Sequence, residues 1–126
     1  MSDRSADAFI DALGRLERDR DVDTIVGLYA DDAVAGNVLR PDEFKGKDGA
    51  REFWAAYRDE FGEISSTFRN VVATDGAVAL EWSSEGTIDG AVISYAGVTV
   101  LELDGDKIRR SCAYYDPSAL TRPMRD

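Results

Sequence analysis

Three aspartates at alternate positions, Asp19, Asp21 and Asp23, have the spacing with which a calcium-binding loop begins. Such a loop also needs a glycine at its sixth position and a bidentate glutamate at its twelfth. Those positions hold Thr24 and Ala30, so the motif is incomplete. We therefore expect no metal site in this protein.

The chain has no histidine and one cysteine, Cys112. The lack of histidine excludes Ser-His-Asp and Cys-His catalysis, imidazole acid–base chemistry and His-based zinc sites. No general base flanks Cys112 in the sequence, so a packed thiol is favoured over a nucleophile. No glycine-rich phosphate loop is present either. We expect no cofactor.

The charge of the chain argues against two classes of partner. The formal net charge is -10 at pH 7, which repels nucleic-acid phosphates and anionic membrane surfaces. No apolar stretch approaches the length of a membrane span, and the first seven residues lack the apolar segment of a secretion signal. We expect neither nucleic acid nor a membrane as partner, and a cytoplasmic location.

Helices are expected in the first half of the chain, because apolar residues recur there at helical spacing up to about Phe61. We expect one helix around Leu13, a second from about Val22 to Tyr29 with Asp21 as its N-cap, and a third from near Asp48. The third helix carries an aromatic stripe, which we interpret as core, with pocket lining as the alternative for two of its members. The stripe consists of Phe53, Trp54, Tyr57 and Phe61, and the two members are Trp54 and Tyr57.

Strands are expected in the second half, where three Asp-Gly pairs separate apolar runs. Asp-Gly accepts the positive φ angles of tight hairpin turns, so the pairs predict an antiparallel meander. The fold class is therefore α+β: three helices cover a strongly curved antiparallel sheet and enclose a pocket. The pairs are Asp75-Gly76, Asp89-Gly90 and Asp104-Gly105; the expected strands are Ser65 to Thr74, Ala77 to Ile88, Ala91 to Leu103 and Lys107 to Asp116, after a short extended piece from Ala33 to Leu39.

The length of 126 residues suits one domain that spans residues 1–126. Such a chain can bury a core without disulfides or metal. We expect residues 1–5 and 121–126 to be flexible tails.

Three segments carry a resemblance to a known family. They are L-Y-A-D-D-A at residues 28–33, F-K-G at 44–46 followed by R-E-F-W at 51–54, and G-D-K-I at 105–108 followed by Y-Y-D at 114–116. In this order and spacing they resemble the NTF2-like superfamily, in the branch of SnoaL-type polyketide cyclases, ketosteroid isomerases and limonene-epoxide hydrolases. The resemblance implies a cone-shaped, cystatin-like fold. It does not select an activity, because the superfamily includes enzymes and non-enzymes.

The resemblance also implies where catalytic groups would lie. The isomerase base falls on Asn37, its oxyanion-hole acid on Thr99 and its oxyanion-hole tyrosine on Leu13. An amide is no base near neutral pH, so ketosteroid isomerase activity is not expected. The carboxylate of the cyclases and epoxide hydrolases falls on Ala113.

The end of the last strand retains two candidate catalytic residues, Tyr115 and Asp116. The alternative for Asp116 is that it caps the turn before Pro117 or faces solvent. Glu81 and Glu85 alternate with inward residues and should face solvent. If the register slipped by one residue, Glu81 would become a candidate base.

Strand alternation, in the register that the resemblance implies, predicts which side chains face the pocket. Arg109 could hold an anionic group there, or could instead be exposed at the start of its strand. Because a β-bulge reverses the facing of residues, it would change part of this assignment. The predicted ligand-binding residues are Asn37, Trp54, Tyr57, Trp82, Tyr95, Thr99, Arg109, Ser111 and Tyr115.

Such a pocket suits a flat or hydrophobic small molecule held by a few hydrogen bonds. The protein is therefore either a small-molecule enzyme of the cyclase, isomerase or hydrolase kind, or a ligand-binding protein without catalysis, or a dimeric interaction domain. The outward face of the last two strands should carry Arg110 and Cys112 beside the apolar Val98, Val100 and Tyr114. In this superfamily that face commonly forms a homodimer interface, and we expect the same here.

Overall fold

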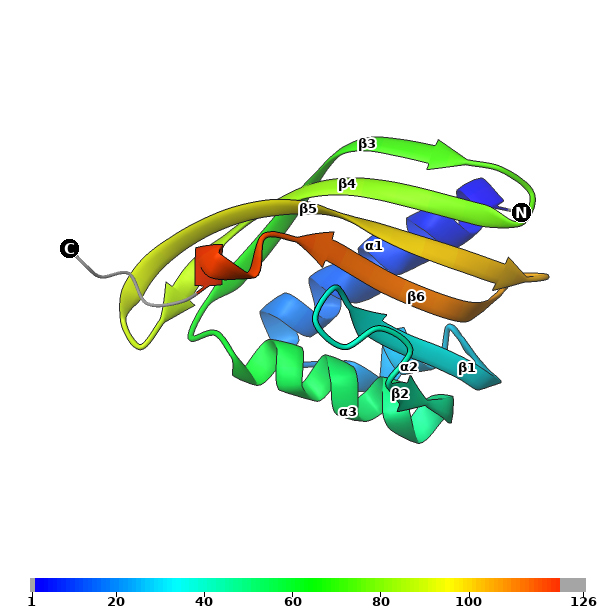
Figure 1. Cartoon of the computed structure of the whole chain (residues 1–126), viewed down its shortest axis with the longest axis horizontal. Coiled ribbons are helices and arrows are strands. Elements are labelled where there is room, and N and C mark those ends of the chain that lie inside the picture. Colours follow the sequence, from blue (N-terminus) through cyan, green and yellow to red (C-terminus); the bar gives the residue numbers. More distant parts are fainter. Residues whose placement is uncertain (1, 121–126) are drawn as a thin grey trace.

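The computed structural model describes residues 2–120, and over these residues three α-helices lie against one curved, six-stranded sheet (Figure 1). The predicted flexible segment 121–126 lies outside the described residues. Residues 2–5, for which we also expected flexibility, belong to the first helix, and Ser5 is buried. The helices are α1 (Ser2–Asp19), α2 (Val22–Val26) and α3 (Gly46–Asp59), and a 3-10 turn, η1 (Pro117–Leu120), follows the last strand.

The sheet has the order β2-β1-β6-β5-β4-β3. Strands β3 to β6 form the predicted antiparallel meander. Strand β1, however, pairs with β6 in parallel, so the sheet is mixed rather than wholly antiparallel. Hairpin signals predict pairing only between strands that are neighbours in sequence. They could not predict the pairing of β1 with β6, because these strands are far apart in the chain. The strands are β1 (Tyr29–Asn37), β2 (Phe44–Lys45), β3 (Ile64–Ala73), β4 (Ala77–Ile88), β5 (Ala91–Asp104) and β6 (Lys107–Tyr115).

Two of the three Asp-Gly turns have the backbone that the pair predicts. Asp89 and Gly90 take φ angles of 52° and 83° between β4 and β5, and Gly105 takes 63° between β5 and β6. These left-handed conformations match the twist of the hairpin strands. The first pair, at residues 75–76, turns the chain without a positive φ.

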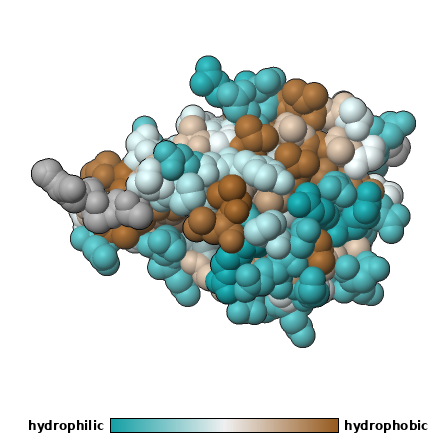
Figure 2. Space-filling model, viewed as in Figure 1, coloured by the Kyte–Doolittle hydropathy of each residue, from teal (hydrophilic) through white to brown (hydrophobic). Residues whose placement is uncertain are grey.

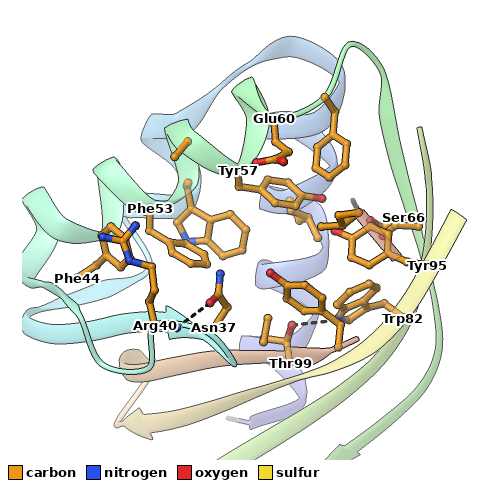
Figure 3. A pocket seen from close by; sticks show the side chains of 18 of the residues that line it. Asn37, Arg40, Phe44, Phe53, Tyr57, Glu60, Ser66, Trp82, Tyr95 and Thr99 are labelled. Carbon is orange, nitrogen blue, oxygen red and sulfur yellow. Dashed lines mark hydrogen bonds between the residues drawn. The ribbon is translucent and has the colours of Figure 1, made fainter. Parts of the chain in front are cut away.

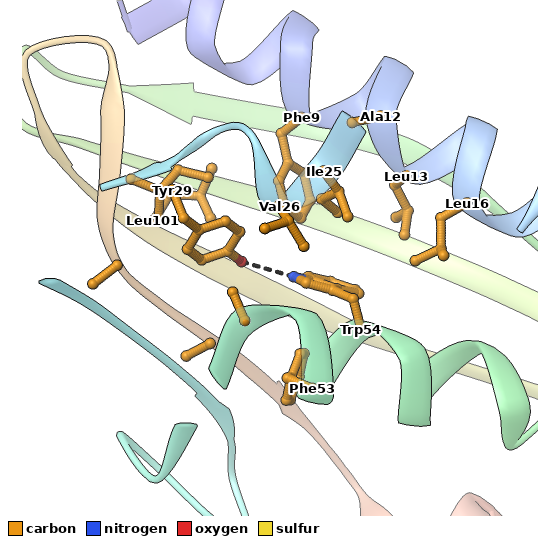
Figure 4. Close-up of a cluster of buried hydrophobic side chains, with 14 of the residues drawn as sticks. Phe9, Ala12, Leu13, Leu16, Ile25, Val26, Tyr29, Phe53, Trp54 and Leu101 are labelled. Carbon is orange, nitrogen blue, oxygen red and sulfur yellow. Dashed lines mark hydrogen bonds between the residues drawn. The ribbon is translucent and has the colours of Figure 1, made fainter. Parts of the chain in front are cut away.

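The main core lies between α1, α3 and the inner face of the sheet (Figure 4). Phe9 and Leu16 of α1 are almost fully buried there, as the helical spacing predicted. A fully buried side chain of this kind contributes about 1.5–3 kcal/mol. Helix α1 packs on β3 and β4, while α3 packs on β1. The two helices therefore cover different strands of the inner face.

Helix α2 is shorter than expected. Asp21 caps it as predicted, since its Oδ1 accepts from the backbone N–H of Thr24 at 3.2 Å. The helix ends at Val26, and Tyr29, which we placed in the helix, begins β1 instead. The backbone of the preceding residue already pairs with β6, because Leu28 O accepts from Ile108 N at 2.9 Å. Sheet pairing therefore overrides the local apolar pattern.

A β-bulge in β6 turns Arg109 outward, so the inward direction that placed it among the ligand-binding residues is wrong and the exposed alternative is confirmed. Glu102 pairs with Arg110 and Leu103 pairs with Ile108, which leaves Arg109 without a partner in the ladder. Both arginines consequently lie on the outer face, where their guanidinium groups approach the Glu102 carboxylate at 3.3 and 3.2 Å. One extra residue in a strand shifts the inward–outward alternation, so the residues beyond the bulge face the opposite side from the one that regular alternation predicts.

Candidate functional site

A cavity of about 220 Å³ occupies the space between helix α3 and the inner face of the sheet (Figure 3). Aromatic side chains from six secondary-structure elements, and one from the loop after α3, form most of its wall. The stripe on α3 therefore supplies both core and pocket lining, as the alternative interpretation proposed for Trp54 and Tyr57. The aromatic lining consists of Phe9, Phe44, Phe53, Trp54, Tyr57, Phe61, Trp82, Tyr95 and Tyr115.

The lining rings also pack on one another. Tyr95 is central: its ring centroid lies 5.1 Å from that of Trp82, 5.5 Å from Tyr115 and 6.2 Å from Phe61. On the helix side, Tyr57 packs edge to face on Trp54 at 5.3 Å. Each such pair contributes about 0.5–1.5 kcal/mol beyond its buried area. The wall is therefore held in shape without a ligand.

Trp82 is fixed by a hydrogen bond and by the glycine next to its ring. Its Nε1 donates to Thr99 Oγ1 at 2.9 Å. Gly97 lies beneath the ring, and a Cβ there would come within 2.8 Å of Trp82 Cζ2 and would clash with the carbonyl oxygen of Tyr114. A glycine at this position lets the rings of Trp82 and Tyr115 meet over the strand.

Asn37, at the end of β1, presents a hydrogen-bond donor to the cavity. Its Oδ1 accepts from the backbone N–H groups of Leu39 at 3.0 Å and Arg40 at 3.1 Å. Because only the amide oxygen can accept, these bonds fix the orientation of the amide. The nitrogen has no partner among the described residues and points into the cavity (Figure 3).

Two tyrosine hydroxyls add to the polar lining. Burial is the main reason that the pKa values of Tyr95 and Tyr115 are raised, and neighbouring tyrosine or glutamate groups raise them further. Both hydroxyls therefore keep their protons at neutral pH. Neither hydroxyl has a hydrogen-bond partner among the described residues, so both are available to a ligand.

A buried carboxylate that the sequence analysis missed, Glu17, lies behind this wall. Only 5% of the residue is exposed. It accepts hydrogen bonds from the Tyr57 hydroxyl at 2.8 Å and from the Ser66 backbone N–H at 3.1 Å and hydroxyl at 2.6 Å. Glu17 follows Leu13 by four residues, so it shares the apolar face of its helix. That spacing is the signal that could have found it.

Three predicted site residues do not reach the cavity. Arg109 is turned outward by the bulge. Ser111 faces inward but is buried in the core, where its Oγ lies 2.8 Å from the Tyr29 hydroxyl. Asp116 is exposed and accepts from the Ser118 backbone N–H at 3.0 Å and hydroxyl at 2.8 Å, which lower its pKa. It caps η1, as the alternative interpretation proposed.

The other predicted ligand-binding residues all line the cavity, and whether they bind a ligand stays a prediction. The alternation of β4 holds as expected, since Trp82 and Ser84 face inward and Glu85 is exposed. The lining residues that the sequence named are Asn37, Trp54, Tyr57, Trp82, Tyr95, Thr99 and Tyr115.

Charged groups are confined to the rim. Among the described lining residues, Glu60 is the single carboxylate and is exposed. Arg40, also exposed, forms an ion pair with Glu43 and lies 5.2 Å from the Phe44 ring centroid. No group of three or more His, Cys, Asp or Glu side chains within residues 2–120 could hold a metal ion. The interior of the cavity is thus apolar with uncharged hydrogen-bonding groups.

The model of the SnoaL-like domain family matches residues 6–111. Among curated proteins, none matches the chain significantly. Three similar solved structures support the predicted fold. An NTF2-like protein from Anabaena variabilis has 17% identity, a TM-score of 0.82, and coverage of 91% of this chain and 89% of its own. A cystatin-fold protein from Novosphingobium aromaticivorans has 27% identity and a TM-score of 0.74, and the match covers 90% of this chain and 97% of that protein. A limonene-epoxide-hydrolase-like enzyme from M. tuberculosis has 24% identity and a TM-score of 0.66, and the match covers 93% of this chain and 84% of the enzyme.

Proposed function

The chain belongs to the SnoaL-like domain family, and we propose that it binds a flat, uncharged, largely apolar small molecule in the cavity beneath α3. The aromatic wall is the observation that carries this proposal. Rings on both sides of the cavity, Trp54 on the helix and Trp82 and Tyr95 on the sheet, offer faces to a planar ligand. Such sites are typically apolar with a few convergent polar groups.

Asn37 and Tyr115 are the proposed hydrogen-bonding partners. The free amide nitrogen of Asn37 and the protonated Tyr115 hydroxyl can both donate to a carbonyl oxygen of the ligand. No charged group of the interior wall, over the described residues, would favour an ionic ligand.

Binding without catalysis is favoured by the positions where the resemblance would place catalytic groups. Asn37, Thr99 and Ala113 all line the cavity, and so does Leu13. These positions therefore face the cavity but carry no acid or base. Asp116, the remaining candidate, is directed at the η1 backbone. A hydrolase is among the similar structures, but the uncharged side chains at these positions favour a binding role.

We also propose a homodimer, packed through the outer face of β5 and β6. The support is apolar exposure on these strands: Val92 is 81% exposed and Tyr114 is 43% exposed. Apolar side chains interrupt the polar surface over this part of the sheet (Figure 2). Light scattering at micromolar concentration tests the proposal, and Tyr114→Glu should convert a dimer to a monomer. A monomeric wild-type protein would contradict it.

Both tryptophans line the cavity, so their fluorescence tests the binding proposal directly. Menadione, a flat two-ring quinone, should quench the emission with a saturable dependence on its concentration. Quenching that rises linearly, as free collision produces, would contradict the proposal. No described helix could cross a membrane, and the cytoplasmic location stays a prediction.

A further inference from the structure

Glu17 is a buried carboxylate that the proposed binding role does not use. It projects from α1 between α3 and β3, and its oxygens contact Tyr57 and Ser66, both of which line the cavity. Glu17 itself does not line the cavity. Whatever it does to a ligand must therefore act through these neighbours.

The direction of the hydrogen bonds around Glu17 follows from the number of hydrogens that each hydroxyl group can donate. A serine hydroxyl has one hydrogen to donate. The hydrogen of Ser66 is directed to Glu17, so the 2.6 Å contact between Ser66 Oγ and Ser84 Oγ must be donated by Ser84. Tyr57 likewise donates its hydrogen to Glu17. The oxygens of Ser84 and Tyr57 then have lone pairs, and no hydrogen, to offer the cavity.

The charges around Glu17 support this direction. The guanidinium of Arg58, also buried, donates from Nε to the Glu17 carbonyl oxygen at 3.1 Å and from its other nitrogens to Phe61 and Gly62 carbonyl oxygens. A fixed positive charge thus lies beside the backbone of Glu17. Burial and then the charge of Glu17 raise the pKa of Tyr57, so the tyrosine keeps its proton and donates it.

We propose that Glu17 makes the β3–β4 side of the cavity a hydrogen-bond acceptor that selects ligands with a hydroxyl group at that end. The proposal rests on ligand binding in the cavity. Asn37 lies on β1, toward the opposite edge of the sheet from β3 and β4, and its amide supplies a hydrogen-bond donor to the cavity. The occupant is therefore polarised: a phenol or alcohol group lies near Ser84, and an acceptor lies near Asn37. Glu17 is a positioning residue, since it fixes the hydrogens of side chains that touch the ligand.

Two probes with the same ring system test the selection. 2-Naphthol can donate a hydrogen bond, while 2-methoxynaphthalene cannot, and both are uncharged at neutral pH. In equilibrium dialysis the wild-type protein should bind 2-naphthol about tenfold more tightly, which corresponds to one hydrogen bond.

Glu17→Gln should abolish this preference. The glutamine amide would donate to Ser66 or Tyr57, which reverses the chain of hydroxyls and turns a hydrogen toward the cavity. The ratio of the two affinities should fall to about twofold or less. Ser84→Ala removes the acceptor without touching Glu17 and should have the same effect, so the test survives if the first variant does not fold. Glu85→Gln, which removes an exposed carboxylate on the outer side of β4, is the control and should keep the tenfold ratio.

The outcomes separate this inference from the proposed function. If the wild-type protein binds both probes equally, or if Glu17→Gln and Ser84→Ala keep the tenfold ratio, the role of Glu17 is overturned while ligand binding stands. If neither probe binds, both proposals fail. Loss of the ratio in these two variants and its retention in Glu85→Gln supports both.

Discussion

The indole N–H of Trp82 donates to the Thr99 hydroxyl at 2.9 Å, across two strands of the cavity floor. Both residues are buried. The bond therefore does two things: it satisfies a polar group that has left water, and it fixes the largest ring of the sheet side against the ligand space.

Replacement of Thr99 should destabilise the protein. In Thr99→Val the indole N–H stays buried without an acceptor, which costs about 1–3 kcal/mol in the free energy of unfolding. Urea denaturation followed by circular dichroism measures this cost. Thr67→Val, at an exposed position of β3, is the matched control and should change stability by less than about 0.5 kcal/mol. Equal effects of the two substitutions would show that the bond contributes nothing.

Replacement of Trp82 should weaken ligand binding. Trp82→Ala removes an aromatic face from the cavity wall, so the affinity for menadione should fall by on the order of 1–3 kcal/mol through lost apolar contact. Quenching of Trp54, which remains in the variant, reports the binding. Glu85→Gln lies on the exposed side of the same strand and should bind like the wild type. Unchanged affinity in Trp82→Ala would remove Trp82 from the site.

The Asn37 amide should recognise a carbonyl oxygen. Asn37→Asp keeps an oxygen for the two backbone N–H groups but replaces the donor that faces the cavity with a second, charged acceptor. Binding of menadione should weaken about tenfold. The wild-type protein should not isomerise 3-ketosteroids, because Asn37 cannot act as a base. Isomerisation that disappears in Asn37→Ala would overturn this assignment.

Gly97 should not tolerate a side chain. Gly97→Ala places a Cβ within 2.8 Å of Trp82 and against the Tyr114 carbonyl oxygen, so overpacking should cost about 1–3 kcal/mol. Gly76→Ala is the control, since its Cβ would meet nothing within 4 Å and its φ is not positive. Thermal unfolding should separate the two variants clearly. A stable Gly97→Ala protein would mean that the two rings are free to shift.

Asp116 should affect acid stability and not binding. Its contacts with Ser118 lower its pKa, so they stabilise the folded state above the ordinary aspartate pKa, and this contribution is lost as the pH falls through the lowered value. The stability difference between wild type and Asp116→Ala should therefore be present at neutral pH and disappear on acidification. Menadione should bind both proteins alike. Weaker binding by Asp116→Ala would return Asp116 to the list of candidate site residues.

The sequence predicted the local features of the fold. The Asp89-Gly90 and Asp104-Gly105 turns lie where their residue types require, and β4 has the bounds that the pattern predicted, Ala77–Ile88. Each of these features depends on residues close in sequence. The parallel pairing of β1 with β6 depends on contacts about eighty residues apart, such as Ile108 N with Leu28 O, and no local pattern reports it.

The site was predictable where simple alternation holds. Trp82, Tyr95 and Thr99 line the cavity because β4 and β5 alternate regularly through this region. For Arg109 the sequence left an inward and an exposed position open, because a bulge changes the facing of a residue without a distinctive sequence signal. Glu17 was overlooked because a charged residue on an apolar helix face is usually solvated, and its partner Ser66 becomes its neighbour only in the folded chain.

Strand β6 lies between β1 and β5, so the centre of the sheet is completed by nearly the last part of the described chain. During synthesis, β1 has no partner in the body of the sheet until residues 107–115 have left the ribosome. The cavity floor, which includes Asn37 of β1 and Tyr115 of β6, cannot form earlier. Until then the open edges of β1 and β5 are exposed to pairing with other chains. The sheet therefore cannot close before β6 is available, and chaperones that shield strand edges would act on the chain before its ligand can.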